Sequence, residues 1–81
     1  MDTKVAIMSI IVESNAIICD IQNLLSEHAD YIIGRFGIPH TEKNIRIISV
    51  VLDAPVNIIN NLTSKIQEIE NVNVHTMFSN I

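Results

Sequence analysis

The residues of this 81-residue chain that could do chemistry are few, and one group stands between an apolar run and a helical pattern. This group is Glu13, Ser14 and Asn15. Exposed backbone N–H groups at the start of a helix can hold an anion. Ser14 or Asn15 can instead cap the helix by accepting a hydrogen bond from an unsatisfied N–H, and we favour that plainer interpretation.

A second group is Arg35 with Gly34 and Gly37 on either side of it. Glycines permit close approach of the backbone to a ligand or partner, and arginine offers a bidentate fork for a carboxylate or phosphate. The alternative is a bulge that sets strand register, with Arg35 paired across an oligomer interface. Both interpretations stay open, and the two groups together form the predicted ligand-binding set.

Metal-ligating residue types are present, but their spacing does not suit a metal. Nitrogen and sulfur ligands are available from Cys19, His28, His40 and His75. No two of these residues have the separation in the sequence that is typical of a metal-binding pair. His28 falls on the apolar stripe of a predicted helix, which indicates a histidine at the edge of the core. We therefore predict no metal site within one chain and no cofactor, and a site formed between subunits stays open.

No pair of residues supports catalysis, which would need a nucleophile beside a base or two carboxylates in one pocket. Glu13 and Asp53 occupy equivalent strand-to-helix junctions, where capping explains both. The sequence therefore predicts no catalytic residues and no enzymatic activity.

Composition narrows the setting and the partners. The net charge of −4 argues against a protein that binds the nucleic-acid backbone directly. With Cys19 as the single cysteine, no disulfide can form within the chain, which favours a reducing interior. The longest apolar stretch, residues 5–12, is too short to span a bilayer, and the first residues do not resemble a signal peptide. We expect a cytoplasmic protein without membrane or nucleic-acid partners.

The elements that must position these residues follow the order strand, helix, strand, strand, helix, strand. Runs of β-branched residues predict strands, and apolar residues at three- and four-residue spacing predict helices. The predicted strands cover 4–12, 31–39, 45–52 and 72–78, and the predicted helices cover 15–28 and 55–70. Asp53 or Ala54 is expected to cap the second helix, with Pro55 in its first turn and Asn71, in the left-handed conformation, closing it.

The two halves of the chain also resemble each other. Equivalent positions in the two halves differ by 40 in residue number, which pairs Ile7 with Ile47 and Ser9 with Ser49. The difference becomes 41 after Pro55. A duplicated strand–helix–strand unit with right-handed crossovers gives a ferredoxin-like fold. We predict an α+β, βαββαβ sandwich formed by one domain over residues 1–81, with a four-stranded antiparallel sheet and both helices on one face.

Such a sandwich leaves one face of its sheet without helices. The central strands are apolar on both faces, so large aliphatic side chains point outward whichever alternate set of residues faces the helices. The sequence leaves open which set does so. The two alternatives are Ile7, Ile11, Ile47 and Val51, or Met8, Ile10, Ile48 and Val50. Burial of each such side chain contributes about 1.5–3 kcal/mol, so we expect a second subunit to cover the face in a homo-oligomer, a dimer or tetramer.

Two segments carry a family resemblance. The run from Gly34 to Pro39 resembles a Gly-Arg-Met-Gly-Ile-Pro signature, and the run from Ile59 to Ile66 resembles Ile-Asn-x-Leu-Thr-Gly-Lys-Leu. Both patterns occur in the iron-only hydrogenase system regulators, which are ACT-like domains similar to the C-terminal domain of the nickel-responsive repressor. Phe36 stands where methionine is usual, and Ser64 where glycine is common.

The resemblance implies an ACT-like fold and a regulatory role. ACT-like domains bind small effectors at subunit interfaces near the loop after the first strand, which here lacks the glycine of the amino-acid-binding members. The predicted function is a non-enzymatic regulatory or ligand-sensing module that acts as a homo-oligomer, with a small effector and a protein partner as candidates. A metal-responsive sensor domain and a structural protein-interaction subunit without a small effector remain the alternatives.

Overall fold

The computed structural model describes residues 2–13, 16 and 18–80, and it has the expected βαββαβ order. Single-turn 3₁₀ helices, η1 (Ala29–Tyr31) and η2 (Thr41–Lys43), precede β2 and β3. The main elements are β1 (Lys4–Glu13), α1 (Ile18–Glu27), β2 (Ile32–His40), β3 (Ile45–Ala54), α2 (Val56–Gln67) and β4 (Val72–Phe78).

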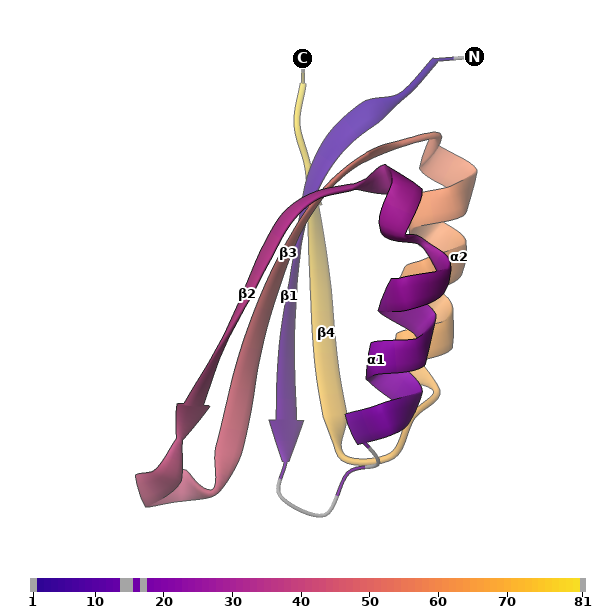
Figure 1. Ribbon diagram of the computed structural model, residues 1–81. Helices are drawn as coiled ribbons and strands as arrows, with labels where there is room; N and C mark the ends of the chain where they lie inside the picture. The colour runs from indigo at the N-terminus through magenta and orange to yellow at the C-terminus, as the bar shows by residue number, and fades with distance from the viewer. Residues whose placement is uncertain (1, 14–15, 17, 81) are drawn as a thin grey trace.

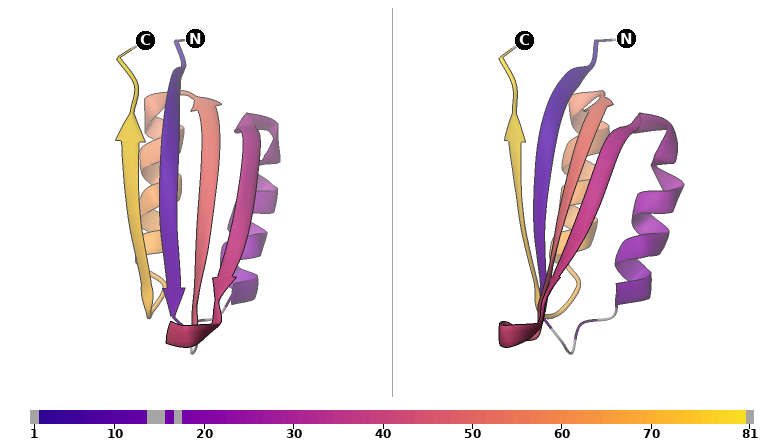
Figure 2. Two further views of the ribbon diagram at one scale, coloured as in Figure 1. Left: turned by 90° about the vertical axis from the view of Figure 1, so that its left-hand side faces the viewer. Right: turned by 60° about the vertical axis from the view of Figure 1, so that its left-hand side comes forward.

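The four strands form one antiparallel sheet in the order β2-β3-β1-β4, and both helices lie against one face of it (Figure 1). The left view of Figure 2 looks onto the other face, which no helix covers and which we call the outer face. The predicted ferredoxin-like βαββαβ sandwich is therefore confirmed. The β2–β3 hairpin lies at the end of the sheet opposite the two chain termini.

The core resolves the parity that the sequence left open. Met8 and Ile10 of β1 and Ile48 and Val50 of β3 are buried beneath the helices, so the row with Ile7 and its partners points outward. Alternation along each strand places one set of side chains on each face of the sheet. The larger core cluster is completed by Val12, Ile21, Leu25, Leu52, Leu62 and Ile66.

Strand β2 carries the irregularity that its glycines predicted. The register with β3 shifts between Ile32 and Gly34, so Ile33 is an inserted residue, and it is 64% exposed. Gly34 then lies opposite Val51 on the outer face, whereas Arg35 lies opposite Val50 and faces the helices. A bulge of this kind adds one residue to one strand and reverses the faces of everything after it.

The start of α2 differs from the prediction. Strand β3 continues to Ala54, so Asp53 is a strand residue opposite Val5 instead of a helix cap. Pro55 takes the N-cap position in an extended conformation and makes no side-chain capping hydrogen bond. The fixed φ of proline suits the step from strand to helix without such a bond. Asn71 has a φ of 65° and enters β4 in the left-handed conformation, as predicted.

Candidate ligand-binding site

Two adjoining pockets lie where the β2–β3 hairpin passes beneath the first turns of α1. The hairpin pocket has a volume of about 280 Å³. It is lined by Val12, Glu13, Ala16, Ile18, Pro39, His40, Thr41, Asn44, Ile45 and Arg46. The arginine pocket has a volume of about 250 Å³ and is lined by Gln22, Arg35, Phe36, Gly37, Pro39, Arg46 and Ile48. Because Pro39 and Arg46 line both, the two pockets form one notch.

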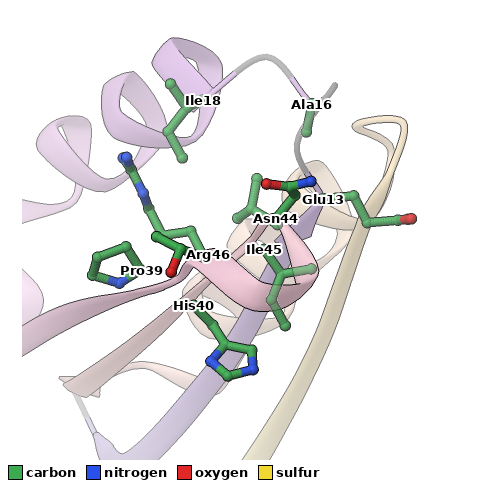
Figure 3. Close-up of a pocket in the computed structure, with 10 residues that line it drawn as sticks. Glu13, Ala16, Ile18, Pro39, His40, Asn44, Ile45 and Arg46 are labelled. Carbon is green, nitrogen blue, oxygen red and sulfur yellow. The ribbon is translucent and has the colours of Figure 1, made fainter.

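Arg46 lies at the junction of the two pockets. It is opposite Pro39 in the register of β2 and β3, on the face that the helices cover. Figure 3 shows its guanidinium rising from β3 toward Ile18 at the start of α1. Within the described part of the chain, Arg46 has no hydrogen-bond or ion-pair partner. The carboxylate of Glu13 points away from it in Figure 3.

Arg35 is held by a contact with α1. Its Nη2 donates a hydrogen bond to the side-chain oxygen of Gln22, and it forms no ion pair with a described carboxylate. An amide that accepts through its oxygen keeps its NH₂ group free to donate. The pocket therefore presents two guanidinium groups and one amide donor, all of which suit an anionic oxygen.

Gly37 forms part of the floor of the arginine pocket. A Cβ added there would lie 3.8 Å from the carbonyl oxygen of Ile47 and 3.9 Å from Cγ1 of Ile48, which is ordinary contact. At Gly34 an added Cβ would meet nothing within 4 Å. Neither glycine has a positive φ, so the backbone would accept alanine at both positions.

The fold brings three of the six predicted ligand-binding residues to the notch. Glu13 lines the hairpin pocket, and Arg35 and Gly37 line the arginine pocket. Gly34 lines neither pocket and lies on the outer face. Ser14 and Asn15 fall outside the described residues.

The sequence prediction missed Arg46, Gln22 and Asn44. Arg46 interrupts the apolar series of the helix-facing residues on β3, and that break was the signal available. Gln22 is half-buried and contacts Arg35. Asn44, which lines the hairpin pocket, has a φ of 54° and closes the turn into β3.

The described residues do not bring metal ligands together. No group of three or more His, Cys, Asp or Glu side chains in this part of the chain could hold an ion. His28 is half-buried, with Nδ1 2.8 Å from the carbonyl oxygen of Leu24, at the edge of the core as predicted. Cys19 is exposed on α1. None of the helices seen here combines the length and apolar character that crossing a bilayer requires.

Comparison with solved structures supports the fold over nearly the whole chain. The uncharacterized protein TM1266 from Thermotoga maritima has a TM-score of 0.91 and 29% sequence identity, covering 95% of this chain and 98% of that one. A formyltetrahydrofolate deformylase from Pseudomonas putida KT2440 has a TM-score of 0.68 and 13% identity, covering 95% of this chain and 29% of the other. The second likeness shows the fold alone.

No protein with curated function matches the chain. The TM1266-like family, described as iron-only hydrogenase system regulator, matches residues 4–76. The match includes the Gly34–Pro39 signature, both helices and most of β4. The chain belongs to the TM1266-like family of iron-only hydrogenase system regulators.

Proposed function

We propose that this protein is a non-enzymatic regulatory module that assembles through its outer sheet face into a homo-oligomer and senses a small effector. The observation that carries the proposal is the apolar outer face in a member of a regulator family. The family description connects the role with the iron-only hydrogenase system. The single cysteine favours the reducing cytoplasm as its setting.

The centre of the outer face is organised in three rows that run across the strands. The outer two rows are mainly aliphatic, and the row between them carries a central pair of serines. The rows are Gly34-Val51-Ile7-Met77, Phe36-Ser49-Ser9-His75 and Ile38-Ile47-Ile11-Asn73. Phe36 and Met77 are each 58% exposed, and Ile38 is 50% exposed. A contiguous apolar surface of this kind marks an interaction site.

The size of the face suits a stable interface. Strand spacing of about 4.8 Å and a rise of about 3.3 Å per residue give four strands a projected area of roughly 500 Å². The accessible area is larger because side chains stand out from the sheet, and a stable interface buries about 800 Å² per partner.

A second copy is the occupant that the pattern favours. The side chains at the centre of the face are uncharged, so a charged partner would find no complement there. A two-fold axis that lies in the interface and parallel to the strands places β1 of one copy over β3 of the other. The serine row then meets the serine row, and each aliphatic row meets its own counterpart, as an isologous interface requires.

The notch supplies the second half of the proposal. Its two pockets lie beside the end of β1 and the start of α1, and both are lined by Arg46, which has no partner among the described residues. A native-state ligand raises the melting temperature by mass action. A thermal-shift screen of amino acids, nucleotides and divalent metals therefore separates an effector-sensing module from a subunit that serves only protein interaction. A metal-responsive sensor would appear in the same screen.

Sedimentation equilibrium at micromolar concentration tests the assembly. We expect the wild-type protein to be an oligomer and Ile11→Glu to be a monomer, because the new carboxylate would be buried in the interface. Val56→Glu is the matched control, since Ile11 and Val56 are each 40% exposed but Val56 lies at the start of α2. A monomeric wild-type protein would overturn the assembly, and a monomeric Val56→Glu variant would place the interface elsewhere.

A further inference from the structure

We infer that the arginine pocket binds a small dianion with paired oxygens, the chemistry shared by phosphomonoesters and short dicarboxylates. This inference rests on the proposed effector-sensing function and names the chemical class of the effector. The charge balance of the pocket is the first argument. The chain has a net charge of −4, yet Arg35 and Arg46 line one pocket and neither forms an ion pair with a described carboxylate.

The side chains around the pocket exclude other ligand classes. Gln22 gives its oxygen to Arg35, and the remaining lining residues are Phe36, Gly37, Pro39 and Ile48. Among the described residues that line the pocket, no side chain offers a carboxylate, imidazole or thiol, so a cation would find no ligand among them. Arginine is charged at every physiological pH, so the positive charge of the pocket is permanent.

Comparison between the two halves of the fold shows that the pocket is an opened version of a packed region. Because Ser9 lies opposite Ser49, a pseudo-two-fold axis passes between them, and it relates β3 to β1 and β2 to β4. The register gives the equivalent positions. Arg35 corresponds to Val74, Gly37 to Thr76, Pro39 to Phe78 and Arg46 to Ala6.

In the second half these positions are packed against α2. Val74 and Phe78 pack on the core, and Ala6 is 1% exposed. The Thr76 hydroxyl lies 2.8 Å from the Thr63 hydroxyl on α2.

In the first half the same helix-to-strand contact is made by different residues. Gln22, which the offset of 41 relates to Thr63, contacts Arg35, while Gly37 leaves empty the space that Thr76 fills. One half of the duplicated fold therefore replaces packing with a vacant, positively charged pocket.

The charge and size of the pocket define the ligand. Two guanidinium groups are neutralised by one dianion, whereas a monoanion would leave one positive charge uncompensated. Each arginine can bind two oxygens of a carboxylate or phosphate side by side. A volume of about 250 Å³ accommodates such a group with a short carbon stem. Ile48, which is 4% exposed, provides an apolar wall beside the two exposed arginines.

NMR titration of the ¹⁵N-labelled full chain tests the inference with inorganic phosphate and with succinate. Chloride at equal ionic strength and acetate are the controls for screening and for monoanions. With a dianion we expect saturable chemical-shift changes at Gln22, Arg35, Gly37 and Arg46. Tighter binding of phosphate would indicate a phosphomonoester ligand, and tighter binding of succinate would indicate a dicarboxylate.

Variants locate the binding. Arg46→Gln should raise the Kd about tenfold or more, because a hydrogen bond to a charged group contributes about 1.5–3 kcal/mol. Gly37→Ala should weaken binding by placing a methyl group in the pocket, whereas Gly34→Ala is its matched control on the outer face and should leave the Kd unchanged. Lys65→Ala, which removes a cation from α2, should also have no effect.

Two results would overturn the inference. The first is that phosphate and succinate shift no more resonances than chloride does. The second is that their binding survives in the Arg35→Gln/Arg46→Gln double variant. The proposed function would still stand if another compound from the thermal-shift screen bound elsewhere and the protein remained an oligomer, so the two failures are distinguishable.

Discussion

Two neighbouring isoleucines on β3 give the sharpest test of the difference between the two sheet faces. Ile48 faces the helices and is 4% exposed, whereas Ile47 faces outward and is 36% exposed. The same substitution, to alanine, can be made at both positions. The two variants lose the same atoms at adjacent positions of one strand, so the difference in strand propensity between isoleucine and alanine cancels when they are compared.

The expected effects differ in kind. Truncation of a fully buried isoleucine costs about 2–5 kcal/mol of folding free energy, and we expect Ile48→Ala to fall in that range. Ile47 is 36% exposed, and this exposed part is what an interface could still bury. Burial of a whole isoleucine side chain contributes about 3 kcal/mol, so the exposed part corresponds to roughly 1 kcal/mol. In a symmetric dimer the loss occurs twice, so the dissociation constant should rise about thirtyfold.

Sedimentation equilibrium and urea unfolding separate the two effects. The dissociation constant should rise for Ile47→Ala, and the unfolding midpoint of the wild-type protein should increase with protein concentration, as for any linked assembly. Ile48→Ala should lower the unfolding midpoint much more than Ile47→Ala does when both are compared as monomers. A dissociation constant for Ile47→Ala within twofold of wild type would refute the assignment of the outer face as the interface.

Three further predictions concern the stability of the folded chain. Gly34→Ala and Gly37→Ala should each leave stability unchanged or raise it by about 0.4–1 kcal/mol in urea unfolding, because neither backbone needs a positive φ; a loss above this size would contradict the open space at Gly34. Thr63→Val should cost about 1 kcal/mol, since it leaves the half-buried Thr76 hydroxyl without its partner, and a double-mutant cycle with Thr76→Val should show positive coupling. Asn44→Val should cost about 1–2 kcal/mol in thermal unfolding, whereas Asn44→Gly should be neutral, because φ is 54° there.

Much of the fold follows from patterns that the sequence states directly. The alternation of Val72, Val74, Thr76 and Phe78 with Asn73, His75 and Met77 marks β4 as half-buried, and the structure agrees. The aliphatic stripe of α2 is confirmed at Ile59, Leu62 and Ile66, although Val56 at its start is 40% exposed. These patterns succeed because burial repeats with the period of the secondary structure. Parity on the central strands could not be predicted, since both faces are apolar and period alone cannot distinguish them.

The bulge in β2 explains why the pocket could not be predicted. If β2 had continued from the Ile32–Leu52 pair without a bulge, Arg35 would lie opposite Ser49 on the outer face. The inserted residue, Ile33, moves Arg35 opposite Val50, onto the side of α1 and Gln22. A shift of one residue reverses the face of every later side chain in a strand. Gly34 and Gly37 indicated that an irregularity was present, but either glycine could have been its site.

Along β2, the repeat read from the sequence and the symmetry of the structure differ by two residues, and the bulge accounts for one of them. The offset of 41 would relate Arg35 to Thr76, whereas the strand register relates Arg35 to Val74 and Gly37 to Thr76. Without the bulge, a positive charge would stand on the apolar outer face, where desolvation would oppose assembly. With the bulge, the charge of Arg35 lies in the pocket, and Phe36 takes the position opposite Ser49 on the outer face. One inserted residue would therefore serve both parts of the proposed function, because it removes a charge from the outer face and adds it to the arginine pocket.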